Sequence, residues 1–361
     1  MVELFVQNGK KLSDAFSDRF VEFLEDEFDG KGTCFSKEVL AGAHQRVTSQ
    51  VEANLEKAIQ SLGFIFEDEI TPEEERHRTL QALDALDTKH ENYLTLYSMA
   101  LLAVYKFGLF LKDQRLVFPV LAAAVMGEIE HDLPYHNNFH FRKVLLHAMR
   151  LIKTHNEIFK GRKNVLDDAA IVKLLICPSI HDLGHDGKNN YASGSYEFAR
   201  LEKRSFSCAE PILKEMGLAG SILDDIETML ITTDVLPFGD PMSPVNQMAA
   251  VYDDHFGMSE EDKLDLSPEL AVLEDRPDLT LQCMLLHGAD IMNSMGINYE
   301  ITRSETKAIN QEIGKDSVSP DDIWLFLNKI CLNAMMSEAV RSLAESAIEE
   351  IFEQVKAEMA A

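Results

Sequence analysis

The sequence predicts an all-α protein, and three observations support this class. Leu, Ala, Glu and Lys recur three or four residues apart along most of the 361 residues, which is the spacing of amphipathic helices. Only 11 prolines and 18 glycines interrupt these runs. Alternating β-branched stretches, which would indicate strands, are scarce. Because 46% of the residues are hydrophobic, we expect these helices to bury a sizeable core.

The chain is longer than a typical single domain, so we expect either one large domain with an appendage or two domains. No Pro-, Gly- or Ser-rich linker marks a boundary between them. We divide the chain into a helical N-terminal region, residues 1–110, and a second domain, residues 111–361.

Two turns in the N-terminal region have the pattern of the twelve-residue EF-hand calcium loop: residues 27–38 and residues 87–98. Lys31 and Lys89 stand where each loop should supply an oxygen ligand, and Ser98 replaces the bidentate acid of the second loop. Calcium takes six or more oxygen ligands, so we do not expect calcium binding. The pair is either a degenerate EF-hand-like module kept for packing or two ordinary helix–turn–helix connections.

Between and after these turns the pattern stays helical. Thr71 should begin a helix, because Pro72 and two acidic residues follow a capping side chain. The most apolar stretch, residues 94–114, is interrupted by Tyr97 and Lys106, so we expect a core helix rather than a membrane span. Further helical runs are predicted at 166–180, 205–217, 221–236, 278–296 and 335–360.

The charge and the cysteines exclude several classes of function. The net charge of −27 repels nucleic acid and anionic membranes. The five cysteines are far apart and include no CxxC pair, so we expect neither a zinc ribbon nor a disulfide framework, but buried free thiols. The first twenty residues lack a basic start followed by an apolar segment, so we expect a cytoplasmic protein.

Four residues have the types and positions of metal ligands. His140, His181, Asp182 and Asp290 end or lie within apolar helical runs. If the fold brings these imidazoles and carboxylates together, they could hold a divalent ion. Asp182 has two oxygens and could bridge two ions, an arrangement suited to phosphoester chemistry.

Five short motifs strengthen this interpretation by their order and spacing: PYHNNFH, HDLGHDGKNN, SCAE, ITTD and HGADIMN. Together they resemble the catalytic domain of class I cyclic nucleotide phosphodiesterases, a helical branch of the metal-dependent HD phosphohydrolases. The resemblance covers about residues 110–350. It implies a compact multi-helix catalytic domain that hydrolyses cAMP, cGMP or both to nucleoside 5′-monophosphates.

The resemblance also implies roles for particular residues. His136 matches the general acid that protonates the leaving oxygen. His140, His181, Asp182 and Asp290 match the ligands of a first ion, Zn²⁺. Asp182 would bridge to a second ion, Mg²⁺ or Mn²⁺, with the attacking hydroxide held between the two ions.

The remaining matches concern supporting residues. Glu210 matches a carboxylate that orients His136 or metal-bound water. His185 and Asn190 match positions that support the metal ligands, and Tyr135 and Asn293 match residues that line the substrate pocket.

The chain departs from the family pattern most strongly in base recognition. The family holds the purine with a glutamine one turn before a phenylalanine, but here the glutamine position holds Asp321, Asp322 or Ile323. An aspartate cannot donate to the purine as an amide does. Trp324 and Phe326 could clamp the base, or they could simply be helix core residues. Two smaller departures are Asp186 in place of a proline and Pro211–Ile212 in place of two histidines.

Metal-dependent cyclic nucleotide hydrolysis is therefore our leading prediction. A phosphohydrolase acting on another nucleotide or phosphoester is the alternative, because the glutamine is missing. A non-catalytic regulatory homologue is a third hypothesis. For partners we expect a small-molecule cyclic nucleotide, no nucleic acid and no membrane, with homodimer formation as a further hypothesis.

Overall fold

The computed structural model describes residues 2–87, 93–192, 194–257 and 264–360. Within these ranges the regular structure is helical apart from one two-stranded antiparallel hairpin, which confirms the predicted all-α class. The N-terminal helices are α1 (Val2–Glu22), η1 (Phe23–Glu27), α2 (Lys37–Thr48), α3 (Val51–Leu62), η2 (Gly63–Phe66), α4 (Pro72–Leu86) and α5 (Leu96–Lys106). The middle of the chain forms η3 (Leu109–Leu111), α6 (Gln114–Gly127), α7 (Asn138–Ile158), α8 (Asp168–Ile180), the hairpin β1 (Tyr191–Ala192) and β2 (Ser195–Tyr196), α9 (Arg200–Glu215), α10 (Gly220–Ile231), α11 (Pro244–Phe256), η4 (Ala271–Asp275) and α12 (Pro277–Met295). The C-terminal helices are α13 (Tyr299–Glu312), α14 (Pro320–Phe326), η5 (Leu327–Cys331), α15 (Leu332–Ala334) and α16 (Glu338–Met359).

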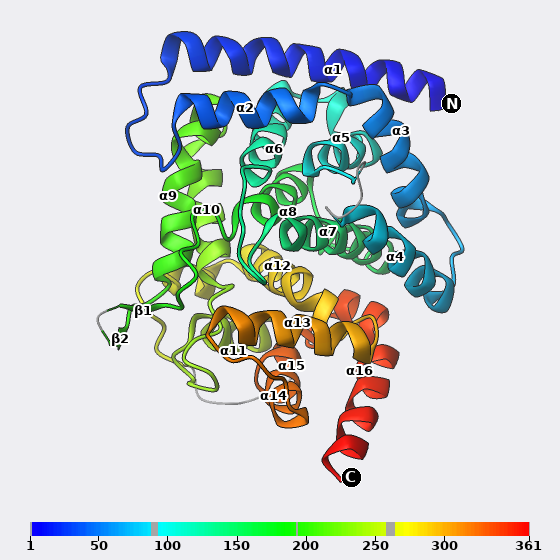
Figure 1. Cartoon of the computed structure of the whole chain (residues 1–361), viewed down its shortest axis with the longest axis vertical. Coiled ribbons are helices and arrows are strands. Elements are labelled where there is room, and N and C mark those ends of the chain that lie inside the picture. The colour runs from blue at the N-terminus through cyan, green and yellow to red at the C-terminus, as the bar shows by residue number, and fades with distance from the viewer. Residues whose placement is uncertain (1, 88–92, 193, 258–263, 361) are drawn as a thin grey trace.

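The three helices that carry the predicted metal ligands lie at the centre of the molecule. Helix α7 packs against both α8 and α12, and α8 also contacts α12. Figure 1 shows α1 and α2 crossing one end of the molecule, while α13 to α16 form the opposite end. The close packing of α12 depends on Gly288, because a Cβ there would stand 2.6 Å from the Val340 side chain of α16.

Local sequence signals explain where several helices begin. Thr71 accepts the backbone N–H of Glu74 with its side chain, and Pro72 occupies the first turn of α4, which confirms the predicted helix start. Ser319 and Asp322 form a reciprocal capping box at the start of α14. The predicted apolar stretch from residue 94 forms the buried core helix α5.

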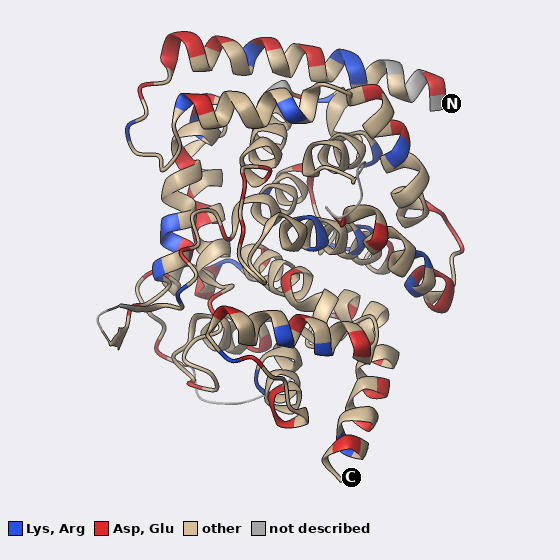
Figure 2. Ribbon diagram, viewed as in Figure 1, with Lys and Arg blue, Asp and Glu red and all other residues tan. Residues whose placement is uncertain are grey.

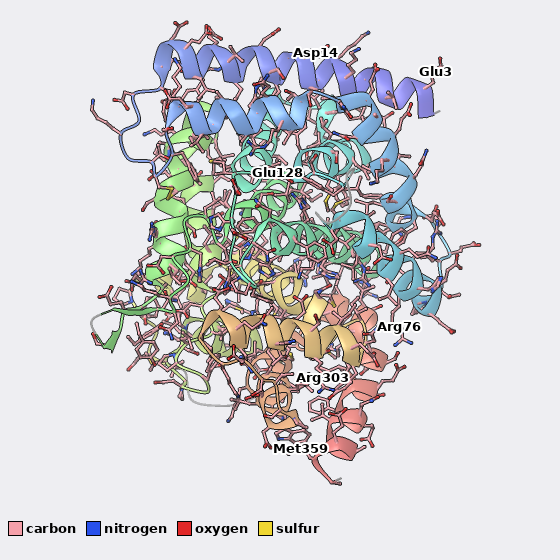
Figure 3. The ribbon with its side chains drawn as sticks, in the orientation of Figure 1. Glu3, Asp14, Arg76, Glu128, Arg303 and Met359 are labelled. Atoms are coloured by element: carbon pink, nitrogen blue, oxygen red, sulfur yellow. A yellow bond between two sulfur atoms is a disulfide. The ribbon has the colours of Figure 1, made fainter. Side chains whose placement is uncertain are left out.

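The N-terminal region and the later helices share one hydrophobic cluster, which extends from Val6 to Val355. Polar contacts also join the two parts. Buried Glu128, at the end of α6, accepts two hydrogen bonds from Arg142 of α7 and one from the backbone N–H of Leu96 at the start of α5 (Figure 3). The predicted boundary at residue 110 remains a prediction, because continuous packing does not define separate domains.

The first EF-hand-like loop is joined covalently to α9. Cys34, in the connection between η1 and α2, forms a disulfide with Cys208, and the Thr33 hydroxyl donates to the Cys208 carbonyl at 2.7 Å. The prediction of free thiols was therefore wrong for this pair, because the fold brings two distant segments together. Cys177, Cys283 and Cys331 are free and buried, as predicted.

Two acidic side chains of that loop form ion pairs with cations of the chain itself. Glu27 pairs with Arg19 at 2.8 Å, and Asp29 pairs with Lys31 at 2.9 Å. In the second predicted loop, Lys89 and the rest of residues 88–92 lie outside the described residues. The choice between a degenerate EF-hand pair and ordinary connections stays open.

Acidic residues are spread along the chain from α1 to α16 rather than gathered in one place (Figure 2). In the part of the chain that the structure describes, no helix combines the length and the apolar character needed to cross a membrane.

Candidate metal centre

Two asparagines set the start of α7 and thereby the position of His140, the first predicted metal ligand. Asn137 caps the helix, because its Oδ1 accepts the backbone N–H of His140 at 3.1 Å. The Asn138 amide donates to the carbonyls of Gly127 and Ile129, both at 2.7 Å. The first turn of α7 is therefore anchored to the end of α6, with His140 buried beneath it.

His181, the second predicted histidine ligand, lies at the C-terminal end of α8. Nδ1 of His181 lies 3.1 Å from the carbonyl oxygen of Pro178. Because a carbonyl only accepts, Nδ1 carries the proton and the lone pair of Nε2 is left for a ligand. The chain then turns back at Gly184, whose φ of +70° lies in the left-handed region that favours glycine.

The structure brings all four predicted metal ligands together. Nε2 of His140 lies 3.1 Å from Nε2 of His181 and 3.1 Å from Oδ1 of Asp290. Nε2 of His181 lies 3.0 Å from Oδ2 of Asp182 and 3.5 Å from Oδ1 of Asp290. The side chains of Asp182 and Asp290 retain 13% and 16% exposure, so the cluster is buried but open on one side.

These distances fit a divalent ion. Ligand atoms about 2.0–2.2 Å from an ion lie about 3.0–3.5 Å from each other in tetrahedral or octahedral geometry. Nε2 of His140, Nε2 of His181 and Oδ2 of Asp182 have this spacing, and Oδ1 of Asp290 lies 3.1 and 3.5 Å from the two imidazole nitrogens. The neutral imidazole and carboxylate donors suit zinc, manganese or iron. The residues present therefore fit a bound metal.

The pKa shifts within the cluster also indicate that a cation would be stabilised there. Burial alone would raise the pKa of Asp182, but the nearby imidazoles of His181 and His136 hold that pKa well below its usual range. Burial likewise opposes the charge of His181, yet Asp182 and Asp290 raise its pKa well above its ordinary value. Two buried carboxylates thus keep a positive charge between them, and a metal ion would supply that charge instead of a proton.

A second group of polar side chains lies beside the cluster. Nδ1 of His136 lies 2.6 Å from Oε1 of Glu312, at the end of α13, and the imidazole rings of His136 and His185 stack at 4.0 Å. The ligand atoms of the three residues lie within 4.8 Å of one another, so their spacing would itself suit a metal. Burial lowers the pKa of His136, but the charges of Asp182 and Glu312 outweigh this effect and raise it.

The neighbouring imidazole behaves in the opposite way. Burial, followed by the charge of His136, lowers the pKa of His185 to about 4. Nδ1 of His185 accepts the backbone N–H of Gly187 at 3.2 Å, so the neutral ring carries its proton on Nε2. The pair therefore contains one histidine that favours the protonated form and one that is neutral at pH 7.

Glu312, not Glu210, forms the hydrogen bond to Nδ1 of His136, so that part of the prediction for Glu210 requires correction, while its alternative role toward metal-bound water remains a prediction. Glu210 lies eight residues beyond Glu202 on α9, which corresponds to a rotation of about 80° and a rise of about 12 Å along the helix. Its charge acts on Glu227 of α10, whose pKa is raised first by burial and then by Glu210. The carboxylate that faces the site from α9 is Glu202.

The supporting role predicted for Asn190 remains a prediction, and the structure shows which residues this side chain contacts. The Asn190 amide donates to Glu202 at 2.9 Å and its Oδ1 accepts the backbone N–H of Leu201 at 2.8 Å. Burial and the charge of Asp234 raise the pKa of Glu202 well above its usual range. Asp234 in turn accepts the hydroxyl of Tyr196 at 2.7 Å. The ITTD motif contained Asp234, but nothing in the sequence singled out Glu202.

Two predicted pocket residues lie near the metal cluster. The ring of Tyr135 packs 4.6 Å from the imidazole of His140 and 4.9 Å from that of His136. Asn293 is buried, and its Oδ1 lies 3.4 Å from Nε2 of His147 of α7. The amide of Asn293 therefore contacts a buried side chain of α7, and the predicted role of Asn293 in the substrate pocket remains a prediction.

The predicted base-binding region is occupied by contacts within the protein. Trp324 packs edge-on against Phe352 of α16 at 5.4 Å, and Phe326 packs against the hydrophobic core. Asp322 is held by the capping box and by Lys315, while Ile323 is buried. Asp321 is exposed in the first turn of α14. The aromatic clamp therefore remains a prediction, and the structure gives these side chains ordinary packing roles.

The fold is similar to that of a phosphodiesterase domain. The chain resembles the crystal structure of the phosphodiesterase domain of the RhoPDE fusion protein from the choanoflagellate Salpingoeca rosetta, with a TM-score of 0.51 and 17% sequence identity. The match covers 76% of this chain and 92% of that domain. No family model and no curated protein sequence matches the chain. Fold and site together define an all-α protein of phosphodiesterase-domain fold with a His/Asp cluster of metal-binding geometry.

Proposed function

We propose that the protein is a metal-dependent phosphodiesterase that hydrolyses the 3′,5′-cyclic nucleotides cAMP, cGMP or both to nucleoside 5′-monophosphates. The observation that carries the proposal is that a candidate metal site and a candidate general acid lie next to each other. The four-residue cluster of His140, His181, Asp182 and Asp290 has the geometry of a metal site, and beside it His136 is paired with a buried carboxylate. A cyclic phosphodiester requires both charge neutralisation and an acid for its leaving group.

The cofactors we propose are Zn²⁺ at the four-residue cluster and Mg²⁺ or Mn²⁺ at a second position next to Asp182. Bound cations would offset the negative charge of the phosphate and lower the pKa of water. The protein side chains would orient the substrate, and Tyr135 would cover one side of the two histidines.

His136 would act as the general acid. Its Nδ1–H donates to Glu312, which fixes the ring orientation and leaves Nε2 to carry the acidic proton. The oxygen of water bonds to phosphorus while the P–O3′ bond breaks, and the proton of His136 passes to the departing oxygen. The proton that the water gives up to solvent restores the protonated form of His136 for the next turnover. Such an acid contributes a factor of about 10²–10⁴ to the rate. The raised pKa of His136 favours the protonated form that this step requires.

Hydrolysis of another phosphodiester is the second candidate, and one observation favours it. Asp322, Ile323 and Trp324 are engaged in capping or packing rather than directed as a base-reading set. A site without such a set would accept a wider range of phosphodiesters.

The decisive experiment measures hydrolysis of cAMP, cGMP and bis(4-nitrophenyl) phosphate in parallel, with Mg²⁺ or Mn²⁺ supplied. His136→Ala and Asp290→Ala serve as controls. Turnover of a cyclic nucleotide that both substitutions abolish would support the proposal. Turnover of only the artificial diester would favour the second candidate. If metal-loaded protein hydrolysed none of the three, the enzyme proposal would be rejected.

A further inference from the structure

The Cys34–Cys208 disulfide lies against the turn that follows the predicted metal ligand Asp182. A Cβ atom placed on Gly184, two residues after Asp182, would lie 3.5 Å from Sγ of Cys208 and 3.8 Å from Sγ of Cys34. Both separations are van der Waals contacts. The bond is therefore part of the packing around the backbone that positions Asp182.

Two hydrogen bonds also hold this turn. The Ser205 hydroxyl of α9 donates to the Leu183 carbonyl at 3.0 Å, and the backbone N–H of Gly184 donates to Nε2 of His131 at 3.2 Å. The turn is thus supported from α9, from the segment before α7 and, through the disulfide, from the N-terminal region. Of these supports, the disulfide is the one that a chemical reaction can remove.

The first EF-hand-like loop depends on the bond for its position on α9. Residues 29–32 and Cys34 are exposed, while Thr33 and Phe35 are half-buried. The Thr33 hydroxyl would still donate to the Cys208 carbonyl after reduction. A single neutral hydrogen bond contributes less free energy than the entropy cost of ordering several loop residues. We therefore expect the loop to leave α9 when the bond is open.

The two sulfurs differ in ways that favour a directed reaction. Cys34 is exposed, so a thiolate can reach its Sγ, whereas Cys208 is only 3% exposed. Arg204 precedes Cys208 by four residues on α9, so the two side chains are neighbours on one face of the helix. A guanidinium beside a cysteine stabilises its thiolate, and a stabilised thiolate leaves faster.

A positive charge remains beside Cys208 after the neighbouring acid is counted. Asp186 lies 3.6 Å from Arg204, but Arg200 binds it more closely, at 3.0 Å. These three side chains together carry one net positive charge. The Arg204 side chain is 46% exposed, so solvent weakens its field and we expect a moderate effect on the reaction rate.

We propose that the Cys34–Cys208 bond is a redox switch that a dithiol reductant opens, and that opening it weakens metal binding at the four-residue cluster. A thiolate of the reductant bonds to Sγ of Cys34 while the S–S bond breaks, and the electron pair of that bond leaves on Sγ of Cys208. The second thiol of the reductant then displaces Cys34 and closes the reductant's own disulfide. The two thiol protons of the reductant pass to the two cysteines. The inference rests on the metal site of the proposed function, not on the proposed reaction.

Calorimetric titration of the full chain with Mn²⁺ tests the effect on metal binding. Mn²⁺ is the probe because soft thiolates favour zinc and copper over manganese. One sample is oxidised, and the other is reduced with dithiothreitol, which is then removed without oxygen. The reduced wild type should bind Mn²⁺ about tenfold more weakly, as expected when a support of metal ligands is lost. Cys34→Ser should show the weaker affinity in both samples.

The rate of reduction tests the role of Arg204. Arg204→Gln should slow reduction by dithiothreitol several-fold, measured as the mass gained by alkylation over time. Lys214→Gln removes the same charge from an exposed lysine on the same helix and should keep the wild-type rate. An unchanged rate in Arg204→Gln would overturn the role of the guanidinium in the switch.

The metal titration separates two kinds of failure. Equal Mn²⁺ affinity in the two redox states of the wild type would overturn the switch, because the bond would then only stabilise the fold. Absence of Mn²⁺ binding in the oxidised chain would reject the metal site as well, and the proposed function with it. Cys34 and Arg204 are exposed, so these tests do not rely on substitutions in the core.

Discussion

Nδ1 of His136 lies 2.6 Å from Oε1 of Glu312, although the two residues are 176 positions apart in the chain. The other carboxylate oxygen, Oε2, accepts the backbone N–H groups of Tyr135 and His136 at 3.1 and 3.2 Å. A single side chain at the end of α13 thus holds both the ring and the backbone of the proposed acid. Glu312 is therefore a positioning residue in the proposed reaction.

Replacing Glu312 by glutamine should shift the pH dependence of catalysis. The negative carboxylate helps to raise the pKa of His136, so a neutral amide will lower it. His136 will then lose its acidic proton at a lower pH, and the alkaline limb of the kcat–pH profile should move in that direction. We expect kcat near neutrality to fall about 10–100-fold. Glu210→Gln is the matched control and should leave the profile in place; a profile that moved only in this control would restore the role first predicted for Glu210.

Removing Asp290 should remove the tightly bound metal. Asp290 contributes an oxygen to the four-atom cluster, and its loss leaves two imidazoles and one carboxylate. We expect the metal content of purified Asp290→Ala, measured by mass spectrometry, to fall about tenfold or more, by analogy with the effect of supporting groups on metal affinity. Asp275→Ala removes an exposed acid on η4 and should keep the wild-type content. Normal metal content in Asp290→Ala would show that the ligand set is incorrect.

Half-buried Glu202 should make the metal-free protein less stable as the pH rises. Burial and Asp234 raise its folded-state pKa, so the folded chain holds this proton more tightly than the unfolded chain. That stabilisation is present below the unfolded value of about 4.3 and is lost as the pH rises through the folded value. Glu202→Gln cannot ionise, so its Tm relative to wild type should increase between pH 5 and pH 8 in metal-depleted protein.

Glu274→Gln, at an exposed acid on η4, provides the control for this comparison. Its Tm difference from wild type should be the same at both pH values. A pH-independent difference for Glu202→Gln as well would refute the raised pKa.

The buried pair of Glu128 and Arg142 should be far more sensitive than a surface pair. Glu128→Leu leaves the Arg142 guanidinium buried without its carboxylate, which should lower the free energy of unfolding by about 3–5 kcal/mol. Glu350→Gln breaks the exposed pair between Glu350 of α16 and Arg76 of α4, the residue labelled in Figure 3, and should cost less than about 1 kcal/mol. Urea unfolding of both variants measures the difference, and equal losses would contradict this account of how α5, α6 and α7 are joined.

The helical class, and the positions of the four candidate metal ligands next to or within apolar helices, could be predicted because those signals are local. His181 and Asp182 end an apolar helix, and Asp290 lies within another, so helical spacing alone placed them on buried faces. Glu312 gave no such signal, since it ends an ordinary polar helix. Its role depends on where α13 packs.

The errors arose for the same reason. Glu210 was assigned by its place in a motif, but its angular position on α9 turns it toward α10. Cys34 and Cys208 are 174 residues apart, and only the approach of the first loop to α9 makes them partners. Contacts between distant segments cannot be read from local spacing.

The Cys34–Cys208 bond closes the chain into a covalent ring with a long C-terminal tail. Four of the site histidines, together with Asp182, lie in the ring, whereas Asp290 and Glu312 lie in the tail. The candidate metal site therefore lies where a closed ring of backbone meets a separate, linear segment. A single protease cut within the ring would leave the molecule in one piece, and its two fragments would separate only when a reductant opened the bond.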